Sequence, residues 1–574
     1  MASIKSTQWR PSAHNQVLAS KLLKEGSITE LLAKLLAQRK VSTAAEVKIF
    51  LSPDLNDLHD PFLMKGMEKA VSRLAAAIDS KEKILLYGDY DVDGTTSIAL
   101  LSEFLKKCNT QPTYYVPDRY KEGYGISLEG IEYAHRHGFT LMIAMDCGIK
   151  AFNPANLAKN YGIDLIICDH HRPEKTLPNA YAILDPLQAQ CEYPFKFLSG
   201  CGVTFKFVQA YCQRQNLSEQ HWMELLDLLV ISIAADIVPL IGENRILAHF
   251  GLKLLDKTKR PGLAALIKHS QKEVPLSISD IVFGIAPLIN AAGRMAEATL
   301  SVSLLLATNA KDATELTNQL AYQNKLRKEF EHRITEEARQ LYEKQKERGD
   351  THSIVLFQPH WHKGVVGIVA SKLVETFHKP TIILTESEGI IVGSARSVRG
   401  FDIHEAIGHC SFSLVNYGGH EYAAGLSLFQ HNLNAFQDCF EGYVAAHITD
   451  EQKTPLIEYN SEINFSAIND SLFEILEILA PFGPSNRNPI FVTRGVVDTG
   501  DSRLLKEKHL KLIMKQEGDL PVKGMAFFIN KEVSNRILSG EIFDICYTLS
   551  QNKWRGRSNW QLVVKDIKLV VHQM

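Results

Sequence analysis

The chain has 574 residues, more than one hydrophobic core usually serves, so we expect three or more domains. Hydrophobic residues make up 45% of it and charged residues 22%, as in ordinary soluble globular proteins. The formal net charge of -2 excludes an overall positive field, so a nucleic-acid partner would have to bind in a local groove.

The cysteines and the N-terminal sequence together predict a cytoplasmic protein. The nine cysteines include no C-x-x-C pair, and their odd number argues against a disulfide framework, so we expect buried thiols in a reducing compartment. The first residues, MASIKSTQWRPSAHNQ, lack the apolar core of a secretory signal. Residues 225–242 are nearly long enough to cross a bilayer, but Asp227, Asp236 and Pro239 interrupt them, so we expect buried core and no membrane partner.

Helices and connecting loops are expected over residues 1–80, where apolar residues recur at a spacing of three to four. From residue 81 to about 310, short apolar runs alternate with helical stretches, the pattern of a parallel sheet built from β-α-β units. Ligands bind beyond the carboxyl ends of the strands in such sheets. Asp146 and the triplet Asp169-His170-His171 both fall at predicted strand ends.

The stretch ILLYGDYDVDGTTSIALL, residues 84–101, places Asp89, Asp91 and Asp93 between an apolar run and an expected helix. Carboxylates this close repel each other unless cations or a phosphoryl group lie among them. A calcium loop would need Glu at its twelfth position, where the chain has Leu100. The segment from Asp91 to Thr95 also has the form of the nucleophile motif of haloacid-dehalogenase-like phosphatases, and this alternative stays open here. A plain surface turn would leave the aspartates without partners.

Asp236 ends another buried run, LLVISIAADIVPL, and a buried carboxylate needs a partner. A metal ion would serve, but on this residue alone a capping or ion-pair role is favoured. After it, a long helix of mixed charge is expected over residues 311–349, joining two lobes.

A second α/β lobe is expected over residues 350–455, with the strand-like runs SIVLF, PTIILT and IIVGSAR. The glycines of YGGH permit close approach of the backbone to a ligand beside His420, and Arg396 and Arg399 supply cations. Together these residues indicate an anion-binding wall, although each also suits an ordinary turn.

Residues 456–574 are rich in short alternating strands and predict a small barrel. Within them, NKWRGRSNWQ interleaves Trp554 and Trp560 with basic residues that include Arg555, the mixture that a single-strand stacking surface uses. A barrel hairpin with two packed tryptophans fits the segment equally well.

The motifs DYDVDG, MDCG, CDHH and AADIVPL, in this order, resemble those of the DHH phosphoesterases and, within them, the RecJ family of single-strand-specific exonucleases. The resemblance extends to PDRYKEGYG, INAAGRM, GSARS and YGGH, and so covers nearly the whole chain. It implies an α/β fold in which a parallel-sheet DHH lobe (81–310) is joined by a long helix to a DHH-associated lobe (350–455), followed by a C-terminal oligonucleotide-binding (OB) barrel (456–574). The dehalogenase alternative is now disfavoured, because it has no use for paired histidines or a third strand-end aspartate.

The resemblance also implies roles for single residues. Asp146 would bridge two metal ions, Asp89 would support or ligate them, and His171 would contact the scissile phosphate or the leaving oxygen. Carboxylates with a single imidazole suit two Mn²⁺ or Mg²⁺ ions better than zinc. The expected metal ligands are Asp91, Asp93, Asp146, His170 and Asp236. The candidate substrate-binding residues are Arg119, Arg294, Ser394, Arg396, His420, Trp554, Arg555 and Trp560.

The implied reaction is two-metal hydrolysis of single-stranded DNA from its 5′ end, in DNA repair and recombination. The implied partners are single-stranded DNA, a single-strand-binding protein and a helicase, with the chain acting as a monomer. Two alternatives are weaker. Cleavage of small nucleotides would leave the barrel without a purpose, and a non-catalytic scaffold would not need the complete ligand set.

One departure from the family pattern concerns a turn. After PFG the family has a Gly-Asn-Pro core, whereas this chain has Pro484-Ser485-Asn486-Arg487. From the sequence we expect the difference to affect the local turn and not the chemistry.

Overall fold

The computed structural model describes residues 7–26, 28–295, 297–347, 349–516, 518–554 and 557–570. The chain forms two compact units. The sheet–barrel unit comprises Pro11–Gly293, Glu297–Leu320 and Glu458–Met574. The mixed-sheet unit comprises Met1–Arg10, Arg294–Ala296 and Ala321–Ile457.

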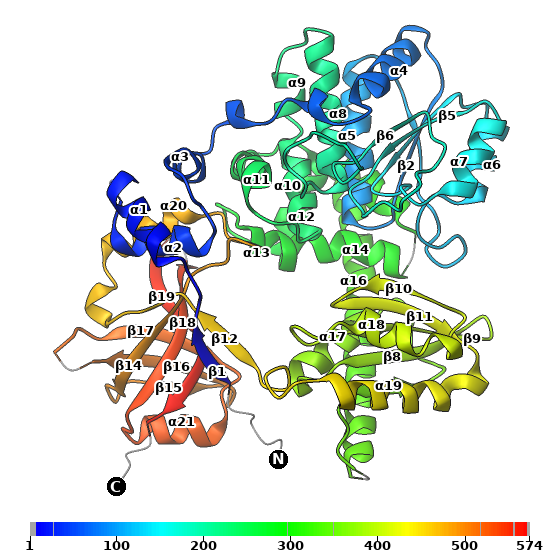
Figure 1. Ribbon diagram of the computed structural model, residues 1–574. Helices are drawn as coiled ribbons and strands as arrows, with labels where there is room; N and C mark the ends of the chain where they lie inside the picture. The colour runs from blue at the N-terminus through cyan, green and yellow to red at the C-terminus, as the bar shows by residue number, and fades with distance from the viewer. Residues whose placement is uncertain are drawn as a thin grey trace. The chain divides into compact units, whose positions relative to one another are not determined.

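A five-stranded parallel sheet surrounded by helices organises the first part of the sheet–barrel unit (Figure 1). Its strand order is β3-β2-β4-β5-β6. β2 and β4 are apolar and buried along their whole length, as expected for strands covered by helices on both faces. The predicted parallel sheet is therefore confirmed. Its strands are β2 (Ile84–Gly88), β3 (Thr113–Tyr115), β4 (Leu141–Met145), β5 (Asp164–Cys168) and β6 (Ala182–Leu184).

Helices cover both faces of this sheet. Leu85, Tyr87 and Met142 pack with α6 and α7 on one face, while α5 and α8 lie against the other and α10 packs on both of them. The helices are α4 (Met67–Asp79), α5 (Val92–Lys107), α6 (Leu128–Arg136), α7 (Phe152–Asn160), α8 (Gly200–Arg214), α9 (Gln220–Met223), α10 (Leu226–Ala235), α11 (Gly242–Leu255), α12 (Pro261–Ser270), α13 (Ile278–Asp280), α14 (Ala286–Met295) and α15 (Thr299–Leu305).

The helices expected over residues 1–80 divide between two partners. The first three pack against α20 (Asp470–Leu479) in one apolar cluster, whereas α4 packs on α8 and β6. A short strand, β1 (Gln8–Pro11), pairs with β12 (Leu456–Tyr459). The first three helices are α1 (Gln16–Gly26), α2 (Glu30–Gln38) and α3 (Ala44–Leu51).

The mixed-sheet unit has five strands in the order β10-β11-β9-β8-β7, with only β7 and β8 parallel. α17 (Val366–Phe377) packs with α16 (Ala310–Lys346) on one face of the sheet, and α18 (Ile403–His409) and α19 (Leu433–His447) pack on the other. The strands are β7 (Ile354–Phe357), β8 (Thr381–Ser387), β9 (Ile390–Arg396), β10 (Asn416–His420) and β11 (Ala423–Leu428).

One prediction about the cysteines is wrong. A disulfide joins Cys410, at the end of α18, to Cys439 in α19, with Cα atoms 6.0 Å apart. The two residues are 29 positions apart and meet only because the two helices pack together, so no spacing motif announced the pair. The other seven cysteines are free, as expected.

The predicted barrel is confirmed. β14, β18, β19, β17 and β16 pair in sequence, and β16 pairs back to β14, which closes the ring. Leu510, Leu512 and Met514 alternate along β16 and fill the interior. The elements are β13 (Ser461–Glu462), β14 (Ile490–Asp498), β15 (Arg503–Leu505), β16 (His509–Lys515), β17 (Val522–Phe527), α21 (Lys531–Leu538), β18 (Phe543–Trp554) and β19 (Arg557–Leu569).

Over the described residues, no helix combines the length and the apolar character that crossing a bilayer requires. The stretch 225–242 forms the buried helix α10 and the turn after it, as expected.

Candidate metal centre

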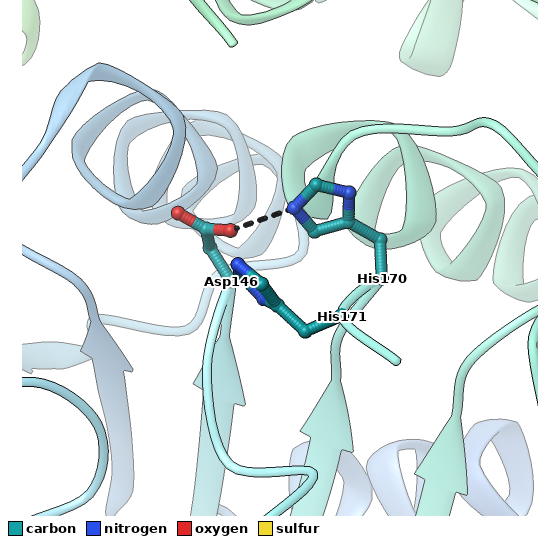
Figure 2. A group of neighbouring side chains, drawn as sticks. All are labelled: Asp146, His170 and His171. Carbon is teal, nitrogen blue, oxygen red and sulfur yellow. Dashed lines mark ion pairs between the residues drawn. The ribbon is translucent and has the colours of Figure 1, made fainter. Parts of the chain in front are cut away.

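The predicted ligands converge at one edge of the parallel sheet. β3 lies on one side of β2 and β4 on the other, so the chain changes direction between β2 and β4, the position at which open α/β sheets bind ligands. Asp89 follows β2 and Asp146 follows β4. His170 and His171 follow β5 and point toward Asp146 (Figure 2).

Three groups of side chains could each hold a metal ion, because the ligand atoms within each group lie within 4.8 Å of one another. Asp146 and His170 each belong to two groups, which joins all three. The groups are Asp89, Asp91 and Asp146; Asp93, His170 and Asp236; and Asp146, His170 and His171.

His170 is surrounded by carboxylates. Its Nε2 lies 3.3 Å from Asp146 Oδ1, 3.6 Å from Asp236 Oδ2 and 3.8 Å from Asp93 Oδ2. None of these contacts has hydrogen-bond geometry, so this buried nitrogen has no hydrogen-bond partner in the described part of the chain. Asp89 Oδ1 is buried and unsatisfied in the same way. Such atoms point to ligands beyond the polypeptide.

Burial and mutual repulsion disfavour the ionised carboxylates. Burial raises the pKa of Asp89, Asp146 and Asp236 well above the ordinary carboxyl range, and neighbouring aspartates raise it further. Burial and Asp93 also raise the pKa of Asp91. A bound divalent cation would remove this penalty, and oxygen donors with one or two imidazoles fit Mn²⁺ or Mg²⁺.

Asp91 starts helix α5. Its Oδ1 accepts the backbone N–H groups of Asp93 (2.8 Å) and Gly94 (3.2 Å), which caps the helix N-terminus. Gly94 has no room for a side chain, because a Cβ there would lie 2.3 Å from the carbonyl oxygen of Asp89. The cap and the close approach together fix the turn that carries the three aspartates.

Asp93 is held by a helix that the sequence did not connect with the site. Its carboxylate accepts the N–H groups of Gly200 (2.6 Å) and Cys201 (2.8 Å) at the start of α8, and the hydroxyl of Ser232 (2.6 Å). The glycine turn Ser199-Gly-Cys-Gly was visible in the sequence, and a helix start of this kind is a known anion site. A Cβ at Gly200 would lie 2.6 Å from Asp146 Cβ, so α8 also packs directly on the central ligand.

The sequence left a capping role open for Asp236. The residue does end α10, but only its backbone N–H takes part, donating to the carbonyl of Ser232 at 2.9 Å. A carboxylate cannot satisfy the carbonyl groups at a helix end, whereas Asp236 Oδ2 faces His170. The side chain therefore serves the cluster and not the cap.

His171 is oriented by Asp169, which the sequence had assigned no role. The two side chains meet at 2.7 Å, and the backbone N–H groups of Ile149, His170 and His171 also donate to Asp169. Although burial acts the other way, the hydrogen bond and charge of His171, together with the N–H of Ile149 and the charge of His170, lower the pKa of Asp169 to about 2. Against the effect of burial, the pair with Asp169 raises the pKa of His171 to about 9.

Tyr124 and Arg119, both from PDRYKEGYG, lie beside the cluster. The Tyr124 hydroxyl contacts the His171 ring at 3.2 Å and donates to the carbonyl of Asp146 at 3.2 Å. Arg119 stacks over the ring of Tyr90 at 4.8 Å, between Asp89 and Asp91 in the chain. Arg119 was predicted, whereas Tyr124 was missed, because a tyrosine in a glycine-rich loop carries no specific signal.

In the mixed-sheet unit, a second group of predicted residues gathers at the start of α17. Arg396 donates to Ser394 Oγ at 2.8 Å. A Cβ at Gly367, in the first turn of α17, would lie 2.9 Å from Ser394 Oγ and 3.0 Å from Arg396 Nη2. Arg294 donates to the carbonyl of Gly364 at 3.0 Å, just before the same helix. We call Arg294, Ser394, Arg396 and the first turn of α17 the α17 cradle.

His420 is exposed on the edge strand β10. It pairs with Ala423, which pairs with Arg396, so His420 lies two strands from Arg396 in one row of the sheet. Arg119 belongs to the sheet–barrel unit, and its reach toward the cradle stays a prediction.

Of the two tryptophans predicted to stack on DNA, the structure describes the side chain of one. The side chains of Trp554 and Arg555 lie outside the described residues. Trp560 is half-buried and stacks on Phe473 of α20, with ring centroids 4.5 Å apart and planes 4° apart. Its face is taken by a protein ring, as the packed-hairpin alternative expects, so we do not assign Trp560 to a strand-binding surface.

Comparison with known proteins agrees with this architecture. Three family models match: the DHH family, N-terminal domain over residues 83–233, the DHHA1 domain over 350–446 and the RecJ OB domain over 459–566. The single-stranded-DNA-specific exonuclease RecJ of Bacillus subtilis is 37% identical over 564 residues, which is 97% of this chain and 70% of that protein.

Solved structures are also similar. RecJ from Thermus thermophilus in complex with Mn²⁺ matches with a TM-score of 0.84 and 25% identity, over 99% of this chain and 80% of that one. Its complex with Mg²⁺ matches with a TM-score of 0.78 and 24% identity, over 98% and 79%. The chain therefore belongs to the RecJ family of single-stranded-DNA-specific exonucleases.

Proposed function

We propose that this protein hydrolyses single-stranded DNA from its 5′ end with two Mn²⁺ or Mg²⁺ ions, in DNA repair and recombination. The observation that carries the proposal is the set of three ligand groups joined through Asp146 and His170 at the switch point of the sheet. The family relationship and the Mn²⁺ complex of the Thermus thermophilus relative support it.

The residues divide into two sets of ligands. Asp89 and Asp91 would hold one ion and Asp93, His170 and Asp236 the other, with Asp146 shared. Bound there, such ions supply a hydroxide nucleophile and stabilise the charge on the leaving oxygen.

His171 is suited to contact the substrate. Because its Nδ1 is paired with Asp169 Oδ1, the Nε2–H, which lies 3.3 Å from the Tyr124 hydroxyl, would donate to a phosphate oxygen that replaces this hydroxyl. The hydroxyl of Tyr124 lies at the same ring and helps to hold its orientation.

The α17 cradle is suited to a terminal phosphate. A helix N-terminus, a hydroxyl and a guanidinium together offer donors to an anion, and the absence of a side chain at Gly367 lets the helix start lie directly against Ser394 and Arg396. Within the described residues of the mixed-sheet unit, Arg396 forms no ion pair. Holding the 5′ phosphate there would select the end of the strand.

The decisive test of the function uses one strand labelled at either end. With Mn²⁺, a 5′-labelled single strand should release label as mononucleotide from the first turnover, while the 3′-labelled strand shortens stepwise. A blunt duplex of the same sequence should resist. Release of 3′ label first, or equal cutting of the duplex, would contradict the proposal. A single-strand-binding protein and a helicase as partners, and a monomeric state, stay predictions of the family resemblance.

The barrel offers another surface for the strand, which we call the β15–β17 face. Its outward side chains include Arg503, Lys511 and Lys523, none of which forms an ion pair in the described part of the chain. Arg503 lies directly opposite Lys511, an unfavourable pairing unless an anion covers it. Phe527 is 53% exposed and Phe528 80% exposed. Basic and aromatic groups together favour the phosphates and bases of a single strand.

Replacing Phe528 by alanine should therefore weaken binding of a long single strand. Base–aromatic stacking is worth about 1–3 kcal/mol per base, so the Kd should rise by about 5-fold to 150-fold. Fluorescence anisotropy with a labelled strand in EDTA would measure it without cleavage. The matched control is Phe412→Ala, which removes an aromatic ring 72% exposed in the mixed-sheet unit. Trp560→Ala should lower the melting temperature instead. Unchanged binding by Phe528→Ala would reject the β15–β17 face.

A further inference from the structure

The segment 478–487, which joins α20 to β14, contains the PFG motif and the departure that follows it. Gly483 and Asn486 exchange both backbone hydrogen bonds, at 3.0 and 3.1 Å, which closes a tight turn. The amide of the fully buried Asn486 donates to the carbonyls of Leu479 (2.9 Å) and Pro481 (2.8 Å), and its oxygen accepts Arg39 Nε at 2.6 Å. The unusual sequence thus forms a turn whose buried polar groups are satisfied.

This turn contacts the segment that follows Asp236. The N–H of Leu240 donates to the carbonyl of Pro484 at 2.8 Å. The buried side chain of Leu240 occupies the space above Gly483, where a Cβ would lie 2.4 Å from Leu240 Cδ1. Only glycine fits at position 483 while Leu240 keeps its place.

The residues between Asp236 and the contact leave little freedom. Ile237 has a φ of +59°, which a β-branched residue adopts only when its surroundings impose it. Pro239 has a fixed φ, and its carbonyl accepts the amide of Asn244 at 3.1 Å. A shift of Leu240 would therefore be passed to Asp236, whose Oδ2 lies 3.6 Å from His170.

Residues 237–241 link Asp236 to helix α11, and we call them the 237–241 linker. Helix α11 is fixed to the segment 478–487 as well. Arg245, in α11, is 2% exposed and donates to the carbonyls of Ile478, Leu479 and Ala480 at 3.0 Å. It also donates to the carbonyl of Phe50 at 2.9 Å. A cation at the end of α20 is favoured by the carbonyl groups collected there. The 236–245 stretch is thus tied to the segment 478–487 at two positions, Leu240 and Arg245.

We propose that the segment 478–487, which precedes the barrel strand β14, positions Asp236. Gly483 and Leu240 then act as positioning residues for the metal centre, because their contact holds the stretch that follows Asp236. The inference rests on the proposed metal role of Asp236. The PFG turn would then set the distance between Asp236 and the other proposed ligands, such as His170.

The test measures Mn²⁺ binding to the whole chain, with electron paramagnetic resonance used to quantify the free ion. Gly483→Ala should weaken the binding of one Mn²⁺ by about 10–100-fold, the usual effect of losing support behind a ligand. In the cleavage assay, kcat at low Mn²⁺ should fall while KM for the strand stays the same, and added Mn²⁺ should restore kcat. Ser485→Gly, an exposed position with φ of +61° in the same turn, is the matched control and should behave as wild type.

Two further variants make the result decisive. Leu240→Val removes the atom that a Cβ at position 483 would meet, so Gly483→Ala/Leu240→Val should recover much of the Mn²⁺ affinity. If Gly483→Ala does not fold, Leu240→Val alone should still weaken Mn²⁺ binding several-fold, because the 237–241 linker loses the contact of Leu240 Cδ1 with Gly483. Folded single variants that both bind Mn²⁺ like wild type would overturn the inference.

Asp236→Asn distinguishes failure of the positioning inference from failure of the proposed metal role of Asp236. It should itself lose affinity for one Mn²⁺. If it binds Mn²⁺ like wild type, the ligand assignment is wrong; if it loses affinity and the positioning variants do not, only the positioning inference fails.

Discussion

Replacing Asp146 by alanine should abolish hydrolysis while leaving strand binding nearly intact. Asp146 shares one ligand group with Asp89 and Asp91, and its Oδ1 lies 3.3 Å from Nε2 of His170, a ligand of the other proposed ion. Its loss should therefore affect both proposed ions at once. A metal ion contributes several kcal/mol to the transition state and about 1.4 kcal/mol is tenfold in rate, so initial rates should fall by about a thousand-fold or more.

The melting temperature of Asp146→Ala provides a second, independent test. In EDTA it should melt no lower than wild type, because it removes one of several buried carboxylates that repel each other. Mn²⁺ should raise the melting temperature of wild type and not that of the variant, since only ions that bind the folded state stabilise it. Differential scanning calorimetry with and without Mn²⁺ measures both effects.

Asp185→Asn is the control for Asp146→Ala. Asp185 is a fully buried carboxyl group after β6, the next strand end in the sheet, and it belongs to none of the three ligand groups. It should keep most of the turnover. If Asp146→Ala turned over at a near wild-type rate in Mn²⁺, the proposed metal centre would be wrong.

Replacing Arg396 by alanine should remove most of the preference for a 5′-phosphorylated strand. The guanidinium is partly buried, which lowers its pKa, and among the residues that the structure describes its Nη1 donates only to Ser394 Oγ and the carbonyl of Ala395. Hydrogen bonds to charged groups are worth about 1.5–3 kcal/mol, so cleavage of the phosphorylated strand should slow by about 10–150-fold. Cleavage of a 5′-hydroxyl strand should slow only a little.

The informative quantity is the ratio of initial rates on the two strands at low concentration. Arg399, also a predicted cation of the anion-binding wall, is exposed and does not belong to the α17 cradle, so Arg399→Ala is the matched control and should leave the ratio unchanged. A ratio that stays the same in Arg396→Ala, with both rates falling together, would reject end sensing by the α17 cradle.

Local sequence pattern was sufficient to predict the strand ends. Short apolar runs followed by Asp89, Asp146 or Asp169-His170 predict both the sheet and the edge at which the ligands meet, because parallel strands share that edge. The roles of α8 and of Ser232 were not predictable in this way. Asp93 meets Gly200 across 107 positions of the chain, and no periodicity encodes a contact of that range.

Composition alone left two interpretations of the barrel hairpin open. NKWRGRSNWQ has the composition of a stacking surface, but composition cannot show that Phe473 covers Trp560. Alternation along β16 does predict which residues point outward, yet the β15–β17 face becomes visible only when the pairing of Arg503 with Lys511 is known.

The packing of α1–α3 on α20 affects how the chain can be synthesised. Leu32 and Leu36 belong to one core with Ile475 and Leu479, and Arg39 hydrogen-bonds to Asn486, which is 447 positions later. At translation rates of about 5–20 residues per second, roughly 20–90 s pass between the emergence of these partners from the ribosome. During that interval the apolar sides of the first helices have no permanent cover. The start of this chain should therefore be among the last parts to reach its final structure, and a nascent-chain chaperone would find its binding site there.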